Sequence, residues 1–236
     1  MNIEEKYAPQ CFADLIFADT TVESICHRYA TSKPYKPLML WGPPGTAKTT
    51  TACVIVKERQ GLAYDPSGFE EFNGAGLSNA NFDKLLNTAA MLKLATGDPI
   101  LVINEFDELP KEDQSIFRAW MDRNKWVHLV VTTNEKPGIQ GVRQKLIPAL
   151  ISRFECVELA PPSLSDLLPR ARSIFQQEGH VVSDNDLRQL LSTYSGDIRD
   201  VLPLIEAALQ GLSKNVAQPV PSKSKLQLVS TPPPTQ

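Results

Sequence analysis

The sequence of 236 residues contains few cysteines, little net charge and no long apolar run. Its four cysteines stand far apart and form no Cys-x-x-Cys pair, which argues against a zinc site and against a disulfide framework. The formal net charge of −3 excludes a surface that is basic all over, so any contact with nucleic acid must be local. No internal repeat is apparent.

The absence of long apolar runs argues against a location in the membrane. No stretch approaches the roughly 20 apolar residues that span a bilayer. The polar, acidic start from Met1 to Pro9 has neither the cationic beginning nor the apolar stretch of a signal peptide. We therefore expect a cytoplasmic protein with no membrane segment. The hydrophobic fraction of 42% is enough for a buried core in one large or two modest domains.

Short apolar runs recur along the chain with helical stretches between them. Those bounded by turn signals are Leu38–Trp41, Phe69–Phe72, Ile100–Ile103, Leu129–Thr133 and Cys156–Leu159. Alternation of this kind predicts an α/β fold in which helices cover a parallel sheet.

The pattern changes after Pro161 and Pro162, where a boundary near Ala160 separates residues 1–160 from a small helical domain at 161–212. Three predicted helices of that domain cover residues 165–178, 184–194 and 197–210. Pro203 is expected to kink the third. Residues 213–236 are rich in Pro, Ser and Gln and are predicted to be a disordered tail, with a short docking peptide at 225–229 as the alternative.

Residues 42–49 read Gly-Pro-Pro-Gly-Thr-Ala-Lys-Thr and lie between an apolar strand and a helix-forming run. Backbone N–H groups of such a turn surround phosphates, Lys48 reaches the β- and γ-phosphates, and the hydroxyl of Thr49 reaches Mg²⁺. The motif therefore predicts a site for ATP and Mg²⁺, the alternative being an ordinary proline-rich turn. Ala47 stands where such a loop normally has a third glycine, so its methyl group must fit a backbone that tolerates only a very small side chain. The predicted binding residues of the loop are Gly42, Pro43, Pro44, Gly45, Thr46, Ala47, Lys48, Thr49 and Thr50.

The third apolar run ends in Asn-Glu-Phe-Asp-Glu at residues 104–108. Ligands of parallel α/β sheets sit at the carboxyl ends of the strands. An acidic residue there normally positions Mg²⁺, and a neighbouring carboxylate deprotonates the attacking water. Because Asn104 is an amide without charge, we expect weaker binding of Mg²⁺ or slower turnover, with Glu105 as the base. The alternative is that these residues only cap the next helix.

Several separate stretches resemble the AAA+ ATPases, and more narrowly the subunits of replication factor C and of phage clamp loaders. The stretches are Glu-Lys-Tyr-Ala-Pro at 5–9, the loop at 42–49, Glu-Phe-Asn-Gly-Ala at 71–75, Asn-Glu-Phe-Asp-Glu-Leu at 104–109, Val-Thr-Thr-Asn at 131–134, the segment 147–154 and Ser-Gly-Asp-Ile-Arg at 195–199. They keep the family's order and spacing over roughly residues 4–210, without the third, collar domain of those subunits. The resemblance implies a P-loop fold with a doubly wound, parallel five-stranded sheet and a small all-α lid.

The same resemblance assigns catalytic roles. Asn134 is expected to polarise the γ-phosphate or the attacking water, and Arg199 to reach from the lid onto the phosphates. Arg153 is expected to act in the site of a neighbouring subunit, where such an arginine is worth roughly 10³–10⁵ in rate. An oligomer with ATP-bridged interfaces is therefore implied.

Other implied roles concern the adenine and the base. Tyr7, Pro9 and Ile16 are expected near the adenine, although Ala8 replaces the arginine of the family's opening motif. Asn73 matches the residue that holds the catalytic glutamate in an inactive rotamer until a partner binds.

The stretch 110–122 is predicted to be a helix, because it begins with proline and carries acidic residues in its first turn. Its predicted core face carries Ile116, Phe117 and Trp120. By resemblance, the matching clamp-loader helix touches the DNA backbone, which makes DNA-contact candidates of Gln114, Ser115 and Arg118.

Taken with the resemblance, these residues predict an oligomeric, clamp-loader-like ATPase that switches on DNA or on a DNA-bound protein such as a clamp. ATP would be hydrolysed to ADP and phosphate with Arg153 acting in trans, on primer–template or duplex DNA. The alternative is an ATP-controlled assembly factor that forms rings or filaments with slow or absent hydrolysis. A protein remodeller is disfavoured, because no convincing aromatic pore loop occurs between Gly74 and Ala80.

Overall fold

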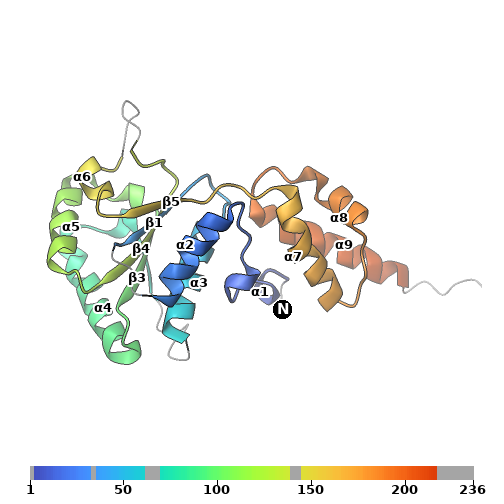
Figure 1. The fold of residues 1–236 in the computed structure, drawn as a ribbon, viewed down its shortest axis with the longest axis horizontal. Helices are drawn as coiled ribbons and strands as arrows, with labels where there is room; N and C mark the ends of the chain where they lie inside the picture. The colour runs from blue at the N-terminus through green and yellow to red at the C-terminus, as the bar shows by residue number, and fades with distance from the viewer. Residues whose placement is uncertain (1–2, 33–35, 62–69, 139–144, 217–236) are drawn as a thin grey trace, which may run out of the picture.

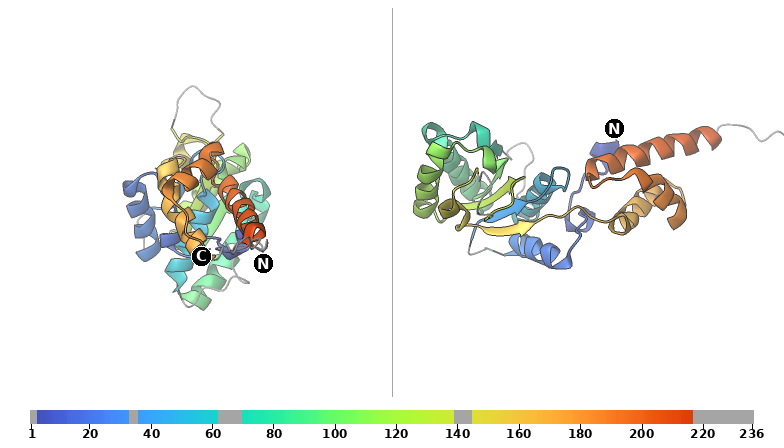
Figure 2. Two further views of the ribbon diagram at one scale, coloured as in Figure 1. Left: turned by 90° about the vertical axis from the view of Figure 1, so that its right-hand side faces the viewer. Right: turned by 90° about the horizontal axis from the view of Figure 1, so that it is seen from above.

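The computed structural model describes residues 3–32, 36–61, 70–138 and 145–216 (Figure 1). A sheet covered by helices forms one part of the molecule, and a separate group of helices forms the other. Figure 2 shows the second group lying beyond one end of the sheet, joined to it by the segment that leaves the last strand. Within the described ranges, no helix combines the length and the hydropathy needed to cross a membrane.

All five predicted strands are present in one parallel sheet, in the order β2-β3-β4-β1-β5. Their bounds are β1 Leu38–Trp41, β2 Glu71–Asn73, β3 Ile100–Asn104, β4 His128–Thr133 and β5 Glu155–Glu158. The predicted α/β fold with a five-stranded parallel sheet is confirmed. The start of the second predicted run, at Phe69, lies outside the described residues.

Helices cover both faces of this sheet, which makes it doubly wound. They are α2 Thr20–Thr31, α3 Lys48–Gln60, α4 Phe82–Thr96, α5 Lys111–Arg123 and the short α6 Pro148–Ile151. Alternate strand residues point to opposite faces. Leu101 and Ile103 of β3 pack in the cluster that contains residues of α4 and α5, whereas Ile100 and Val102 pack in the cluster that contains residues of α2 and α3. The central strands β1, β3 and β4 are therefore buried on both sides, as their unbroken apolar runs predict.

The remaining helices form a third apolar cluster, which we call the lid. They are α7 Leu164–Gln177, α8 Asp184–Leu190 and α9 Val201–Val216. The chain leaves β5 at Glu158 and caps α7 with Ser163, whose hydroxyl accepts from the backbone N–H of Asp166. The N-terminal helix α1 Ile3–Lys6 adds Ile3 to the same cluster.

The last predicted helix differs from the structure at both ends. Residues Ile198–Asp200 form a 3₁₀ turn, and α9 begins only at Val201. Pro203 is therefore the third residue of α9, in the first turn, where a missing N–H breaks no helical hydrogen bond. The expected kink in a helix interior was wrong. Because α9 runs to Val216, it also covers the first residues of the predicted tail, while residues 217–236 lie outside the described part of the chain.

Helix α5 corrects two further predictions. Ile116 is 41% exposed and not part of the core face, while Phe117 and Trp120 are buried. Gln114 is fully buried and cannot touch DNA. Its amide nitrogen donates to the carbonyls of Leu109 and Lys145, 2.9 and 2.8 Å away, and its amide oxygen accepts from the backbone N–H of Ile147 at 2.8 Å. Gln114 therefore joins the loop after β3 to the segment that leads into α6.

Candidate functional site

A cavity of about 670 Å³ lies at the carboxyl ends of the strands, between the sheet and the lid. Side chains from widely separated parts of the chain line it. Among the predicted site residues, those in its lining are Pro9, residues 44–50, Glu105, Asn134 and Arg199. The structure therefore brings together the loop, the predicted base and one of the two predicted arginines.

The loop at 42–49 folds into a tight turn whose geometry depends on very small side chains. Gly45 has φ +80°, and a Cβ atom there would lie 2.2 Å from the Cγ atom of Asp197 in the lid. Ala47 has φ 60° and ψ 27°, which is the left-handed region. The sequence predicts a backbone here that tolerates only a very small side chain, and this is such a backbone. This conformation costs roughly 1–2 kcal/mol for a residue with a Cβ atom.

Lys48 begins α3 and folds its side chain back over the loop. Its amine donates to the carbonyls of Gly42 and Pro43, at 2.9 and 2.7 Å. Burial lowers the pKa of Lys48 from its usual value, and the charge of Arg199 lowers it further. A cationic amine and a guanidinium thus face the same cavity, an arrangement suited to a polyanion such as a triphosphate.

The lid contacts the loop directly through the turn at 195–199. The backbone N–H of Ile198 donates to the carbonyl of Gly45 at 2.9 Å, and the carboxylate of Asp197 accepts from the N–H of Arg199 at 2.9 Å. The first bond holds the lid turn against the phosphate loop, and the second shapes the turn itself. A ligand that separates the lid from the loop must break at least the Ile198 contact.

Asn104 lies at the end of β3, against the first turn of α3. Its amide oxygen accepts from the hydroxyls of Thr49 and Thr132, each 3.0 Å away, and its amide nitrogen donates to the carboxylate of Glu71. Thr49 and Asn104 thus present adjacent oxygens, the donor type that Mg²⁺ prefers. No cluster of three acidic, histidine or cysteine ligands exists among the described residues, so most ligands of a bound Mg²⁺ would come from phosphates and water. The residue types fit such an ion, with Thr49 and Asn104 as its protein neighbours.

Glu105 adopts a left-handed backbone conformation, with φ 50° and ψ 46°. The amide nitrogen of Asn73 donates to its carboxylate at 2.7 Å. Gly74, the residue after Asn73, lies so close to Glu105 that a Cβ atom on Gly74 would be 2.3 Å from the carbonyl oxygen of Glu105. Strained backbones of this kind occur where the surrounding structure dictates the position of a functional group. The end of β2 therefore holds the predicted base in place.

Arg153 lies away from this cavity. It precedes β5 at the amino ends of the strands, in the lining of a second cavity of about 430 Å³ together with the first residues of β3 and β4. Its guanidinium forms an ion pair with Asp122 of α5, with Nη2 and Oδ2 2.9 Å apart. This hydrogen bond from Arg153 lowers the pKa of Asp122 below its usual value. Of the predicted catalytic residues, Arg153 alone is not brought to the first cavity.

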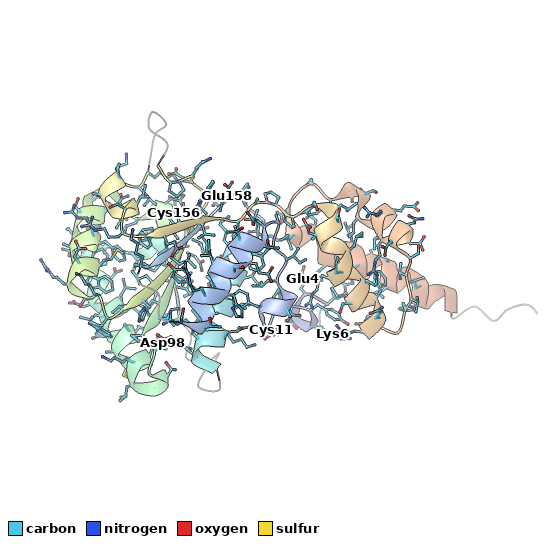
Figure 3. All side chains as sticks on the ribbon, in the orientation of Figure 1. Glu4, Lys6, Cys11, Asp98, Cys156 and Glu158 are labelled. Carbon is cyan, nitrogen blue, oxygen red and sulfur yellow. The ribbon has the colours of Figure 1, made fainter. Side chains whose placement is uncertain are left out.

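Two of the three residues predicted near the adenine do not line this cavity. Tyr7 is 4% exposed and packs in the lid cluster, where its hydroxyl donates to Glu178. Ile16 lines a separate hollow of about 120 Å³ beside Thr46. Figure 3 places Lys6 on the N-terminal segment near the lid, and its amine pairs with Glu178 at 2.6 Å. The segment thus fastens to the lid, and Pro9 is the predicted adenine-side residue in the cavity.

The sequence reasoning missed Glu71 and Thr132, both of which bind Asn104. A signal for them was present in the strand period. Glu71 precedes Asn73 by two residues and Thr132 precedes Asn134 by two, so each shares a strand face with a residue already selected.

Comparison with known proteins places this site in context. The model of the "ATPase family associated with various cellular activities (AAA)" matches residues 38–161. Mouse replication factor C subunit 5 is 27% identical over 222 residues, which is 89% of this chain and 61% of the mouse protein. The replication factor C large subunit of Methanococcus maripaludis is 27% identical over 90% of this chain and 43% of its own length. The chain therefore spans about half of the length of such relatives.

Solved structures show the same fold at lower identity. The RuvB Holliday junction branch migration motor of Thermotoga maritima superposes with a TM-score of 0.66 and 19% identity, over 89% of this chain and 68% of RuvB. Domain III of the replication initiation protein DnaA from the same organism has a TM-score of 0.62 and 14% identity, over 89% of this chain and 92% of that domain.

Proposed function

Because the chain belongs to the AAA family of ATPases, we propose that it is an oligomeric, clamp-loader-like switch that hydrolyses ATP on DNA or on a DNA-bound protein. The observation that carries this proposal is the separation of the two predicted arginines. Arg199 lines the cavity that also contains Lys48 and Glu105, whereas Arg153 lines a cavity at the opposite ends of the strands. An arginine that cannot serve its own site can serve the site of a second copy.

The charged and polar residues at this site have proposed tasks in hydrolysis. Lys48 and Arg199 bind the β- and γ-phosphates as charged donors. Glu105 takes the proton of the attacking water while the bond from the γ-phosphorus to the bridging oxygen breaks, which leaves ADP and phosphate. Asn134, at the end of β4, orients that water or polarises the γ-phosphate. Mg²⁺, when bound beside Thr49 and Asn104, neutralises charge on the phosphates.

Arg153 completes the site from a neighbouring copy. The developing charge on the transferred phosphoryl group is stabilised by its guanidinium, an effect worth roughly 10³–10⁵ in rate in comparable enzymes. Before it can act there, Arg153 must leave the ion pair with Asp122, which is exposed to solvent on both partners. Exposed ion pairs of this kind are weak, so the exchange for a phosphate is favourable.

Asn73 supplies a proposed control. Its hydrogen bond occupies one carboxylate oxygen of Glu105 and keeps the base from turning toward water. Binding of DNA or of a partner protein is proposed to release Glu105. The choice of DNA rests on the near-full-length similarity to replication factor C subunits, which covers 89% of the chain for the mouse protein.

A second function has a specific observation in its favour. Asn104 brings no charge to the metal side of the cavity, and Glu105 is held by Asn73. Both features slow hydrolysis, so ATP could act mainly as the link between subunits of a ring or filament.

One experiment separates the two functions. Steady-state Mg·ATP hydrolysis is measured with and without primer–template DNA, for the unmodified chain and for Arg153→Ala, alongside size analysis in ATP and in ADP. Stimulation by DNA that disappears in Arg153→Ala supports the switch. Negligible hydrolysis in every condition, with ATP bound and the assembly larger in ATP than in ADP, supports the assembly factor and contradicts the switch.

A further inference from the structure

Two residues on one face of β2 reach across to the last residue of β3 and to the residue that follows it. Asn73 donates to Glu105, and Glu71, two residues earlier, accepts from Asn104. The pairing of the strands explains this, since Asn73 lies opposite Asn104 in the parallel register. The contact from Asn73 concerns Glu105, the proposed base. The contact of Glu71 concerns Asn104, the proposed protein neighbour of Mg²⁺.

The contact with Glu71 decides which way the amide of Asn104 faces. An ionised carboxylate can only accept hydrogen bonds, so the NH₂ group of Asn104 must point toward Glu71. The amide oxygen then points toward the hydroxyls of Thr49 and Thr132, each 3.0 Å away. These two hydroxyls do not fix the orientation alone, because a hydroxyl can donate or accept.

Glu71 is itself held in this position. Its second carboxylate oxygen accepts from the thiol of Cys53 on α3, with sulfur and oxygen 3.3 Å apart. Burial, with the nearby charge of Glu71, raises the pKa of the Cys53 thiol to about 12. The thiol therefore keeps its proton at neutral pH and remains a donor. One carboxylate oxygen faces α3 and the other faces Asn104.

We propose that Glu71 is the positioning residue for the magnesium side of this site, a role that rests on the proposed ATPase function. It turns the oxygen of Asn104 toward Thr49, where an aspartate would present an oxygen without help. It also places a negative charge directly behind the neutral amide, which polarises the amide toward the metal side. Together, Asn104 and Glu71 replace a single aspartate.

Glu71→Gln tests this role, because glutamine can donate as well as accept and no longer dictates the orientation of Asn104. Binding of a fluorescent ATP analogue is titrated first without metal and then with increasing Mg²⁺. We expect unchanged affinity without metal, since Lys48 and the loop are intact, and about a tenfold rise in the Mg²⁺ concentration needed for half of the metal-dependent effect. Glu70→Gln is the matched control, since Glu70 pairs with Lys84 instead.

The second arm introduces Asn104→Asp. An aspartate carries its own charge and has two equivalent oxygens, so it does not need Glu71 for orientation, and beside Glu71 it suffers repulsion between two carboxylates. Glu71→Gln should therefore raise the Mg²⁺ requirement when residue 104 is Asn and lower it when residue 104 is Asp. This reversal of sign would show that residues 71 and 104 act together on the Mg²⁺ requirement.

The outcomes separate this role from the proposed function. An equal effect of Glu71→Gln in both backgrounds, or no effect in either, overturns the positioning role, provided that the unmodified chain binds Mg·ATP. Failure of the unmodified chain to bind the nucleotide at all overturns the ATPase function as well. If Glu71→Gln alone does not fold, as judged by its thermal transition, Asn104→Asp is compared with the double variant, and a Mg²⁺ requirement that does not fall in the double variant overturns the role.

Discussion

Arg153 and Arg199 are both predicted to act on ATP phosphates, yet the structure places them at opposite ends of the same parallel strands. A strand of six residues such as β4 spans about 20 Å, which separates the two edges by more than a side chain can reach. Arg199 shares its cavity with Lys48, and Arg153 is paired with Asp122. The difference supports the proposal that Arg199 serves the site of its own chain and that Arg153 serves the site of another copy.

The largest expected effect comes from removing the amine of Lys48, which is proposed to bind the phosphates. Lys48→Ala should abolish nucleotide binding, because no other lysine stands among the described residues that line the cavity to replace its proposed contacts with the β- and γ-phosphates. Arg153→Ala should leave the affinity unchanged, because Arg153 lies outside that cavity. Equilibrium binding of a fluorescent ATP analogue measures both. Retained affinity in Lys48→Ala would overturn the assignment of the site.

Arg199→Ala should weaken nucleotide binding without abolishing it. A hydrogen bond to a charged group contributes about 1.5–3 kcal/mol, so its loss lowers the affinity about 10- to 100-fold. The loss should be the same at every protein concentration, because Arg199 lines the cavity of its own chain. Arg188→Ala, which removes an exposed arginine of α8, is the control and should bind normally. An affinity loss that depends on protein concentration would assign Arg199 to a subunit interface.

Asp122→Asn should sharpen the comparison by releasing Arg153 from its partner. We expect hydrolysis to reach half of its maximum at a protein concentration about two- to fivefold lower, because a weak surface ion pair no longer competes with the neighbouring site. The measurement is the hydrolysis rate as a function of protein concentration. Glu112→Gln, at the other end of α5, is the control. An unchanged concentration dependence would show that the ion pair does not restrain Arg153.

The smallest effect concerns the pH dependence of that ion pair. The hydrogen bond from Arg153 lowers the pKa of Asp122 from its usual value of 3.8. A lowered pKa in the folded state means that the ion pair stabilises the protein above pH 3.8 and that this contribution is lost as the pH falls through the lowered value. The difference in thermal midpoint between the unmodified chain and Asp122→Asn should therefore disappear at the acidic end of a pH series. A constant difference across the series would assign the stabilisation to another cause.

Most of the fold could be predicted from the sequence because its signals are local. The apolar runs of β1, β3 and β4 are buried on both faces, so their composition alone marks them. Ala47 could be placed in a special backbone conformation because its loop pattern requires one. The loop, Glu105 and Asn134 could be expected in one place because they follow parallel strands that end at one edge.

The rest depends on contacts between side chains that are distant in sequence. Gln114 reads as a surface residue of a helix, and only the fold shows that it binds three backbone groups of two other segments. Tyr7 is predicted near the adenine, and only the fold shows that its hydroxyl contacts Glu178, far along the chain. The role of Glu71 could not be predicted from the sequence either, because nothing local in the sequence links it to Asn104.

The most direct test of the account mixes two inactive variants. Lys48→Ala subunits bind no ATP but keep Arg153, and Arg153→Ala subunits bind ATP but lack the arginine. The steady-state hydrolysis rate of each variant and of an equimolar mixture is measured at a concentration at which the unmodified chain is active. The account predicts negligible rates for each variant alone and a clear recovery in the mixture, because Arg153 of one subunit completes the site of the other. A mixture as inactive as its components would contradict the claim that Arg153 acts in a second copy.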